Sequence, residues 1–183
     1  MTDRQLFGQE ARALAQIAAP VIVAELGWAS MGIVDSLVVG PLGPAAIAAV
    51  ALGTGVFSAI VVFGMGVLLG LDTLVSHAFG AERLDECRTL LYQGLWLALF
   101  VTPLVIGLDL LAVASLDHWG LNPDIARLTK PYLIAVGCSA PPLLVFTALR
   151  RYLLGVHIVR PVMMTLLTAN VINLVAKIGR AHV

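Results

Sequence analysis

Charged side chains are scarce in this sequence. Of 183 residues, only 12% are Asp, Glu, Lys or Arg and 60% are apolar, whereas a soluble domain typically carries about 25% charged residues. The 11 Lys and Arg residues balance the 11 Asp and Glu residues, so no basic excess exists to attract a nucleic acid. The composition excludes a disordered chain and an ordinary soluble protein, and it argues against nucleic-acid binding.

Cysteines and catalytic motifs are also sparse. Cys87 and Cys138 are the two cysteines, and they have no CxxC spacing, so neither a disulfide framework nor a zinc site is expected. The sequence contains no HExxH, GxSxG or Walker lysine motif, which leaves hydrolytic or ATP-driven chemistry without a residue to carry it. We expect neither enzymatic activity nor a cofactor or resident metal.

Long apolar runs dominate what is present. Charge-free segments cover residues 36–71, 89–108, 131–149 and 161–176, and about 20 apolar residues suffice to cross the hydrocarbon core of a bilayer. Backbone groups in lipid must bond to one another, and period-2 alternation is absent from this sequence. We therefore expect an all-α, polytopic membrane helix bundle. After a cytoplasmic segment, 1–14, its five predicted spans are 15–39, 45–71, 89–116, 127–149 and 161–177.

The distribution of Lys and Arg predicts the orientation of these spans. On the side of the N-terminus lie Arg4, Arg12, Arg83, Arg88, Arg150, Arg151 and Arg160, and on the opposite side lie Arg127 and Lys130. Because positively charged loops stay in the cytoplasm, the N-terminus is predicted to be cytoplasmic.

Acidic residues inside the spans are the first candidates for function, because each costs about 2.5 to 3.5 kcal/mol at a helix centre. Asp35, close to Gly32, is a candidate proton acceptor or sodium ligand. Glu25 lies about 15 Å earlier on the same helix and cannot share an ion with Asp35, but it is a candidate for a substrate path. Asp109 ranks below these two. Asp72 is expected to be a hydrated acid at the cytoplasmic boundary.

Prolines and amides form a second group of candidates. Pro20, Pro141 and Pro142 are expected to bend the first and fourth helices, because an interior proline removes a helical hydrogen bond. Such bends border substrate paths in transporters but also serve packing alone. Asn170 and Asn173 lie one turn apart on one face of the fifth helix. Amides inside a membrane usually hydrogen-bond neighbouring helices to one another. If this face meets Asp35, the two amides become candidate ion ligands.

Glycines of the second span are expected to allow close helix packing. They are Gly53, Gly55, Gly64, Gly66 and Gly70.

The end of the sequence interrupts the apolar pattern. Residues 178–183, Ile-Gly-Arg-Ala-His-Val, back-translate to a sequence that resembles a common sequencing adapter whose next in-frame codon is a stop. We therefore expect residues 178–183 to be foreign, with only the first base of codon 177, an A, native. An A at this base excludes a native Asp at position 177.

Three segments resemble the multidrug and toxic compound extrusion (MATE) transporters. They are Met31-Gly32-Ile33-Val34-Asp35-Ser36, Gly70-Leu71-Asp72-Thr73-Leu74-Val75-Ser76-His77 and Ala169-Asn170-Val171-Ile172-Asn173. The resemblance implies a fold of twelve helices in two lobes, of which this chain supplies helices one to five, an incomplete N-terminal lobe. It also implies a multi-pass protein of the cell inner membrane that exports small organic, often cationic, substrates in exchange for H⁺ or Na⁺.

The resemblance further implies roles for individual residues. Asp35 matches the acid of the cation site, and Asn170 and Asn173 match polar positions of helix five. Pro20 matches a proline that bends helix one in one branch of the family. That branch has an Asp at the position of Lys177, so the sequence departs from its pattern there, and the coupling ion stays open between H⁺ and Na⁺.

Two other functions remain open from the sequence. One is a flippase for lipid-linked precursors within the same superfamily, which a strongly cationic cavity would favour. The other is a non-catalytic membrane subunit that works with a partner such as an ATPase. An intramembrane enzyme ranks behind both, because paired catalytic residues are missing.

Overall fold

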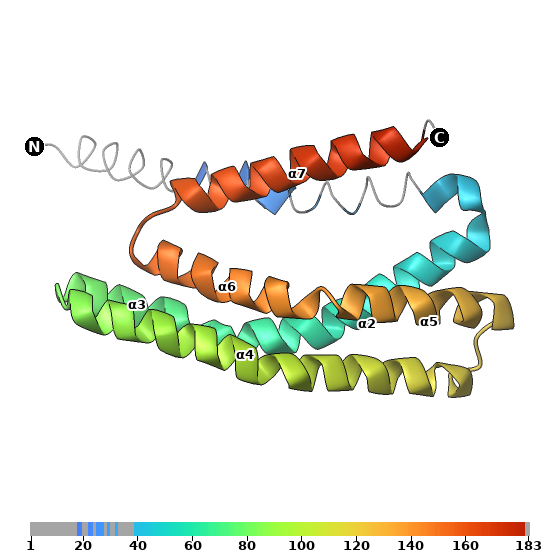
Figure 1. The fold of residues 1–183 in the computed structure, drawn as a ribbon, viewed down its shortest axis with the longest axis horizontal. Coiled ribbons are helices and arrows are strands. Elements are labelled where there is room, and N and C mark those ends of the chain that lie inside the picture. The colour runs from blue at the N-terminus through green and yellow to red at the C-terminus, as the bar shows by residue number, and fades with distance from the viewer. Residues whose placement is uncertain are drawn as a thin grey trace, which may run out of the picture. The chain divides into compact units, whose positions relative to one another are not determined.

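The regular elements of the described residues are all helical, as Figure 1 shows. The computed structural model describes residues 18–19, 22–23, 25–27, 29, 32 and 39–181, with side chains up to residue 173. The α-helices are α2 (Pro44–Leu68), α3 (Gly70–Gly80), α4 (Leu84–Ser115), α5 (Pro123–Gly137), α6 (Ala140–Gly155) and α7 (Arg160–Ala181), with the short 3-10 helices η1 (Gly40–Leu42) and η2 (Leu116–His118). The all-α prediction is confirmed.

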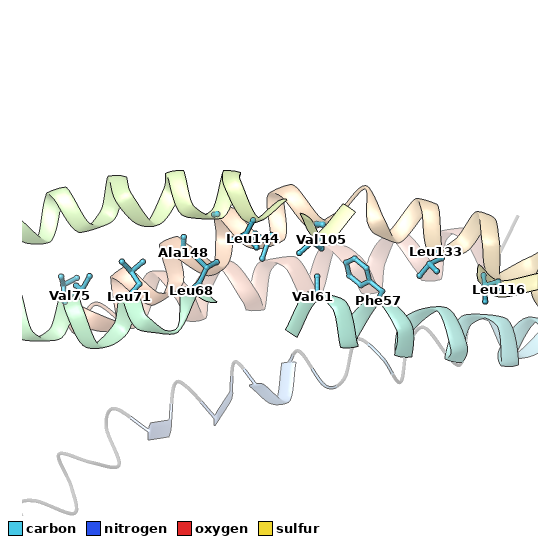
Figure 2. Packing of buried hydrophobic residues seen from close by; sticks show 14 residues of the cluster. Phe57, Val61, Leu68, Leu71, Val75, Val105, Leu116, Leu133, Leu144 and Ala148 are labelled. Carbon is cyan, nitrogen blue, oxygen red and sulfur yellow. The ribbon is translucent and has the colours of Figure 1, made fainter. Parts of the chain in front are cut away.

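The chain divides into two compact units. One comprises residues 1–38 and 158–183, and the other comprises residues 39–157. In the larger unit, α2 packs on α4 and α5, and α4 also packs on α3 and α6. Its core consists of aliphatic side chains and one aromatic ring, drawn in Figure 2, and Leu68, Val75, Val105, Leu133 and Leu144 are fully buried within it.

Helix α2 begins where glycine and proline together reverse the chain. Gly43 has a φ of +95°, which favours glycine, and Pro44 occupies the first helical turn, where its missing N–H costs nothing. At the other end, Leu69 keeps helical backbone angles, so α2 continues almost directly into α3. The two form a helix of 37 residues, Pro44–Gly80.

Prolines have different effects in the next helices. Pro103 lies inside α4 without ending it. By contrast, α5 ends at Gly137, and α6 begins at Ala140 with a bend of 45° between the two. Pro141 and Pro142 lie in the first turn of α6, directly after this bend.

Two helices of the described residues, Pro44–Gly80 and Leu84–His118, have the length and apolar character of membrane spans, and the bent pair α5–α6 makes a third if it counts as one span. Large apolar side chains cover their outer surfaces, and Phe100 is 76% exposed and Trp96 62% exposed. Such a surface suits lipid rather than water. Most of the first predicted span, 15–39, lies outside the described residues, and α7 covers the fifth.

Glycines permit close packing at some of the predicted positions. A Cβ atom at Gly64 would lie 3.0 Å from Val105 and 3.2 Å from Leu144, and one at Gly53 would lie 2.5 Å from the Tyr132 ring. Around Gly55, Gly66 and Gly70, no described atom lies within 4 Å of such a Cβ. The packing role is therefore confirmed for Gly53 and Gly64 only.

Candidate functional site

The predicted ion site belongs to the smaller unit, and the structure describes only part of it. Asp35 and Pro20 lie outside the described residues, as does the side chain of Lys177. Glu25 is described and exposed. Asn170 and Asn173 are half-buried on α7.

Asn170 lies where the first helix approaches α7. Its Nδ2 donates a hydrogen bond to the Leu166 carbonyl oxygen at 2.9 Å, one turn earlier in α7. A Cβ atom at Gly27 would lie 2.8 Å from the same Nδ2, so Gly27 lies directly beside this amide. Asn173 is one turn further along the same face of α7.

The larger unit contains Asp109, an acid that ranks below Asp35 and Glu25 as a candidate from the sequence. Asp109 is only 2% exposed, and it lies on the inner face of α4 with Ala98 and Val105. Among the described residues, its Oδ1 has no hydrogen-bond partner. A Cβ atom at Gly137 would overlap Oδ2 and lie 3.1 Å from Cγ, so the carboxyl group rests directly on the end of α5.

Asp72, at the end of the second span, is not simply a hydrated acid. Arg151 Nη1 donates to Asp72 Oδ2 at 2.8 Å, and the two side chains are 26% and 33% exposed. The ion pair joins α3 to α6, and the prediction for Asp72 is corrected accordingly. The pairing escaped sequence reasoning because the two residues are 79 positions apart.

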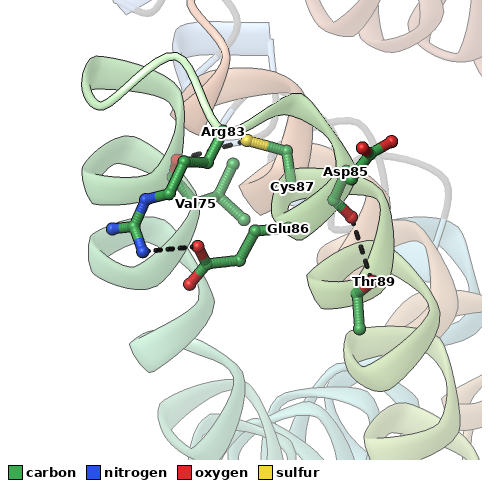
Figure 3. A network of polar contacts seen from close by, with 6 residues as sticks. All are labelled: Val75, Arg83, Asp85, Glu86, Cys87 and Thr89. Carbon is green, nitrogen blue, oxygen red and sulfur yellow. Dashed lines mark hydrogen bonds and ion pairs between the residues drawn. The ribbon is translucent and has the colours of Figure 1, made fainter.

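Polar contacts also fix the turn between α3 and α4, shown in Figure 3. Arg83 pairs with Glu86 at 2.7 Å, and the buried Cys87 thiol donates a long hydrogen bond, 3.9 Å, to the Val75 carbonyl oxygen. At the opposite end of α4, Lys130 pairs with Asp117 at 2.6 Å. The Arg83–Glu86 pair and the Lys130–Asp117 pair therefore lie at opposite ends of the larger unit.

Apolar helices of membrane length, packed through glycines and enclosing an acidic residue, define a polytopic α-helical membrane protein. Comparison with protein families gives the class more closely: the MatE family model matches residues 20–178. The chain therefore belongs to the MatE family, which consists of membrane transporters and not enzymes.

Relatives named for multidrug resistance cover most of this chain. It is 31% identical over 175 residues to the multidrug resistance protein MdtK of Yersinia pestis (strain Pestoides F), and 28% identical over 171 residues to the MdtK of Photorhabdus laumondii. Each alignment covers 93% of this chain and 37% of the relative. The chain thus spans little more than a third of the length of these relatives.

Proposed function

We propose that this chain forms part of a secondary active antiporter that exports small organic compounds, cationic ones among them, in exchange for H⁺ or Na⁺. The family match over residues 20–178 and the names of the relatives support this proposal. Because the chain spans 37% of the relatives' length, the activity is proposed for a protein of their full length that contains it.

The contact between Gly27 and Asn170 carries the proposed ion site. It supports the proposal that Asn170 and Asn173 are ion ligands, because it brings Asn170 beside a residue of the same predicted span as Asp35. The first and fifth spans cross the membrane in the same direction in the proposed topology. Asp35 follows Gly27 by eight positions in the sequence and Asn173 follows Asn170 by three, so Asn173 is proposed as the amide nearer to Asp35.

In the proposed mechanism, Asp35 gains a proton or Na⁺ in the outward-open state as the substrate leaves. Ion binding then favours the return to the inward-open state, because the ion and the substrate bind different states of one equilibrium. Pro20, Pro141 and Pro142 supply bending points, and Glu25 lines the substrate path. The observed 45° bend at the α5–α6 break supports the role of the last two prolines.

The charge distribution of the larger unit supports the proposed orientation. Arg83 lies at the start of α4, whereas Lys130 pairs with Asp117 just after the end of α4. The Asp72–Arg151 pair joins the first turn of α3 to the second half of α6. The arginine-rich end is proposed to face the cytoplasm of the inner membrane, as the positive-inside rule requires.

Substitution of Asp35 in the full-length protein tests the ion site. The source DNA is first read across codons 170–183 and beyond, which also shows whether residues 178–183 are native. Asp35→Asn is then expected to abolish ion-driven substrate uptake into everted vesicles, in which the cytoplasmic face points outward, while membrane insertion is preserved. Asp85→Asn, at an exposed position in the first turn of α4, is the matched control and keeps this uptake. Normal uptake by Asp35→Asn vesicles rejects the assignment.

Cysteine labelling tests the orientation. In a background with Cys87→Ser and Cys138→Ser, single cysteines are introduced by Ala81→Cys and Asp124→Cys, both at exposed positions near opposite ends of the larger unit. A membrane-impermeant maleimide added to intact cells is expected to label the second variant only. Labelling of the first variant alone would show that the protein is inserted the other way round.

A further inference from the structure

The strongest unexplained feature is the buried carboxyl group of Asp109 at the break between α5 and α6. It is 98% removed from the surface, lies on Gly137, and has an Oδ1 atom without a partner in the described part of the chain. A buried carboxylate needs a cation or several hydrogen-bond donors, because an ion removed from water is otherwise strongly destabilising. The neighbouring groups of Asp109 indicate whether its carboxyl group is protonated or ionised.

The end of α5, which Asp109 contacts, carries backbone carbonyl groups that can accept hydrogen bonds. In a continuous helix, the N–H of residue 141 would bond to the carbonyl of Gly137, and that of residue 142 to the carbonyl of Cys138. Both residues are proline and have no N–H. The carbonyl groups of Gly137, the residue that Asp109 contacts, and of the next residue, Cys138, are thereby left without their helical donors.

The charged groups of the neighbouring helices are engaged elsewhere. Helix α2 carries no ionisable side chain. On α5, Tyr132 shares a hydrogen bond with Thr54, and Lys130, about 10 Å before Gly137 along the helix, is paired with Asp117. On α6 and α3, the charges of Arg151 and Asp72 meet each other. The other ionisable groups of the elements packed on α4 are Asp124, Arg127, Arg150, Tyr152, His77 and His118, and none lies within a turn of Gly137 in sequence. The thiol of Cys138, directly after Gly137, is exposed.

We propose that Asp109 is a second proton-binding site, distinct from the predicted ion site at Asp35, and that its protonated carboxyl group donates to the carbonyls freed by Pro141 and Pro142. In the neutral form it fastens α4 to the break. Loss of the proton leaves a carboxylate against carbonyl oxygens, whose mutual repulsion opens this contact and frees the bend to change. The site is thus a proton-sensitive latch on the fourth span.

Infrared spectroscopy of the full-length protein tests the proposal without reference to transport. A protonated carboxylic acid gives a C=O stretching band separate from the amide bands, and this band is expected at neutral pH and is lost in Asp109→Asn. Asp85→Asn, which changes an exposed acid in the first turn of α4, is the control and leaves the band in place. An identical band in the wild type and in Asp109→Asn, or no band in either, overturns the proposal.

A second variant tests the carbonyl partner. Pro141→Ala restores an N–H that bonds to the Gly137 carbonyl, so the Asp109 acid loses an acceptor and its C=O band is expected to move to higher frequency. Leu143→Ala, two residues further along α6, creates no new donor and leaves the band position unchanged. An unshifted band in Pro141→Ala overturns the proposed hydrogen bond.

Discussion

Replacement of Gly155 by alanine tests the packing of α6 on α3. A Cβ atom at this position would lie 2.7 Å from Cγ1 and 2.9 Å from Cβ of Val75, which is fully buried. Valine is branched at Cβ and strongly restricted in rotamer, so it cannot turn its side chain away. The two helices must move apart instead.

The size of the effect follows from comparison with a second glycine. Gly107 lies inside α4, and no described atom comes within 4 Å of a Cβ built there. Both Gly→Ala changes gain about 0.5 to 1 kcal/mol from helix propensity, but only Gly155→Ala pays an overpacking cost of about 1 to 3 kcal/mol. The propensity gain cancels in the comparison, so Gly155→Ala is expected to be less stable than Gly107→Ala by about 1 to 3 kcal/mol.

Reversible unfolding of the full-length protein in mixed micelles measures this difference. Val75→Ala should cost less stability in the Gly155→Ala background than in the wild type, because it removes Cγ1, the nearer of the two clashing atoms. Equal stability of Gly155→Ala and Gly107→Ala would show that α6 and α3 do not approach as closely as described, and the argument from glycine packing would fail.

Two further predictions concern α3 and the turn that follows it. In a double-mutant cycle with Asp72→Asn and Arg151→Met, the coupling energy in unfolding experiments is expected to be about 1 kcal/mol, because the pair is only partly exposed; a coupling energy of zero would mean that the pair contributes nothing. Glu82 has a φ of +58°, so Glu82→Gly is expected to raise the stability by about 1 kcal/mol through relief of the left-handed conformation, measured by the same unfolding assay; a loss of stability would contradict this reasoning.

The sequence predicted the helical fold because its signal is composition and length, which do not depend on partners. The break before Pro141 was also predictable, because proline acts on its own backbone. The contacts of Asp109 and Asp72 were not, since they depend on which helices meet. A pattern of small or inward-facing residues, Ala98, Val105 and Asp109, marks the buried face of α4, but only the packed structure shows that Gly137 covers it.

The glycines show the same limit. Gly66 and Gly70 form the GxxxG pattern that favours helix association, yet open space surrounds both in the described part of the larger unit. Gly64 lies on a different face and carries the contact. Spacing identifies residues that share a face, whereas the choice of face is made by the neighbouring helices.

The length of the helix Pro44–Gly80 has a practical consequence. Its 37 residues extend about 55 Å, whereas the hydrocarbon core is about 30 Å thick, and a typical tilt of about 20° takes up little of the excess. A helix of this length is expected to extend beyond the bilayer. The α3–α4 hairpin at its end, where the Cys87 thiol donates to the Val75 carbonyl oxygen, would form a stiff projection. An antibody fragment raised against this hairpin would give a small membrane protein the rigid external marker that image alignment in electron cryomicroscopy requires.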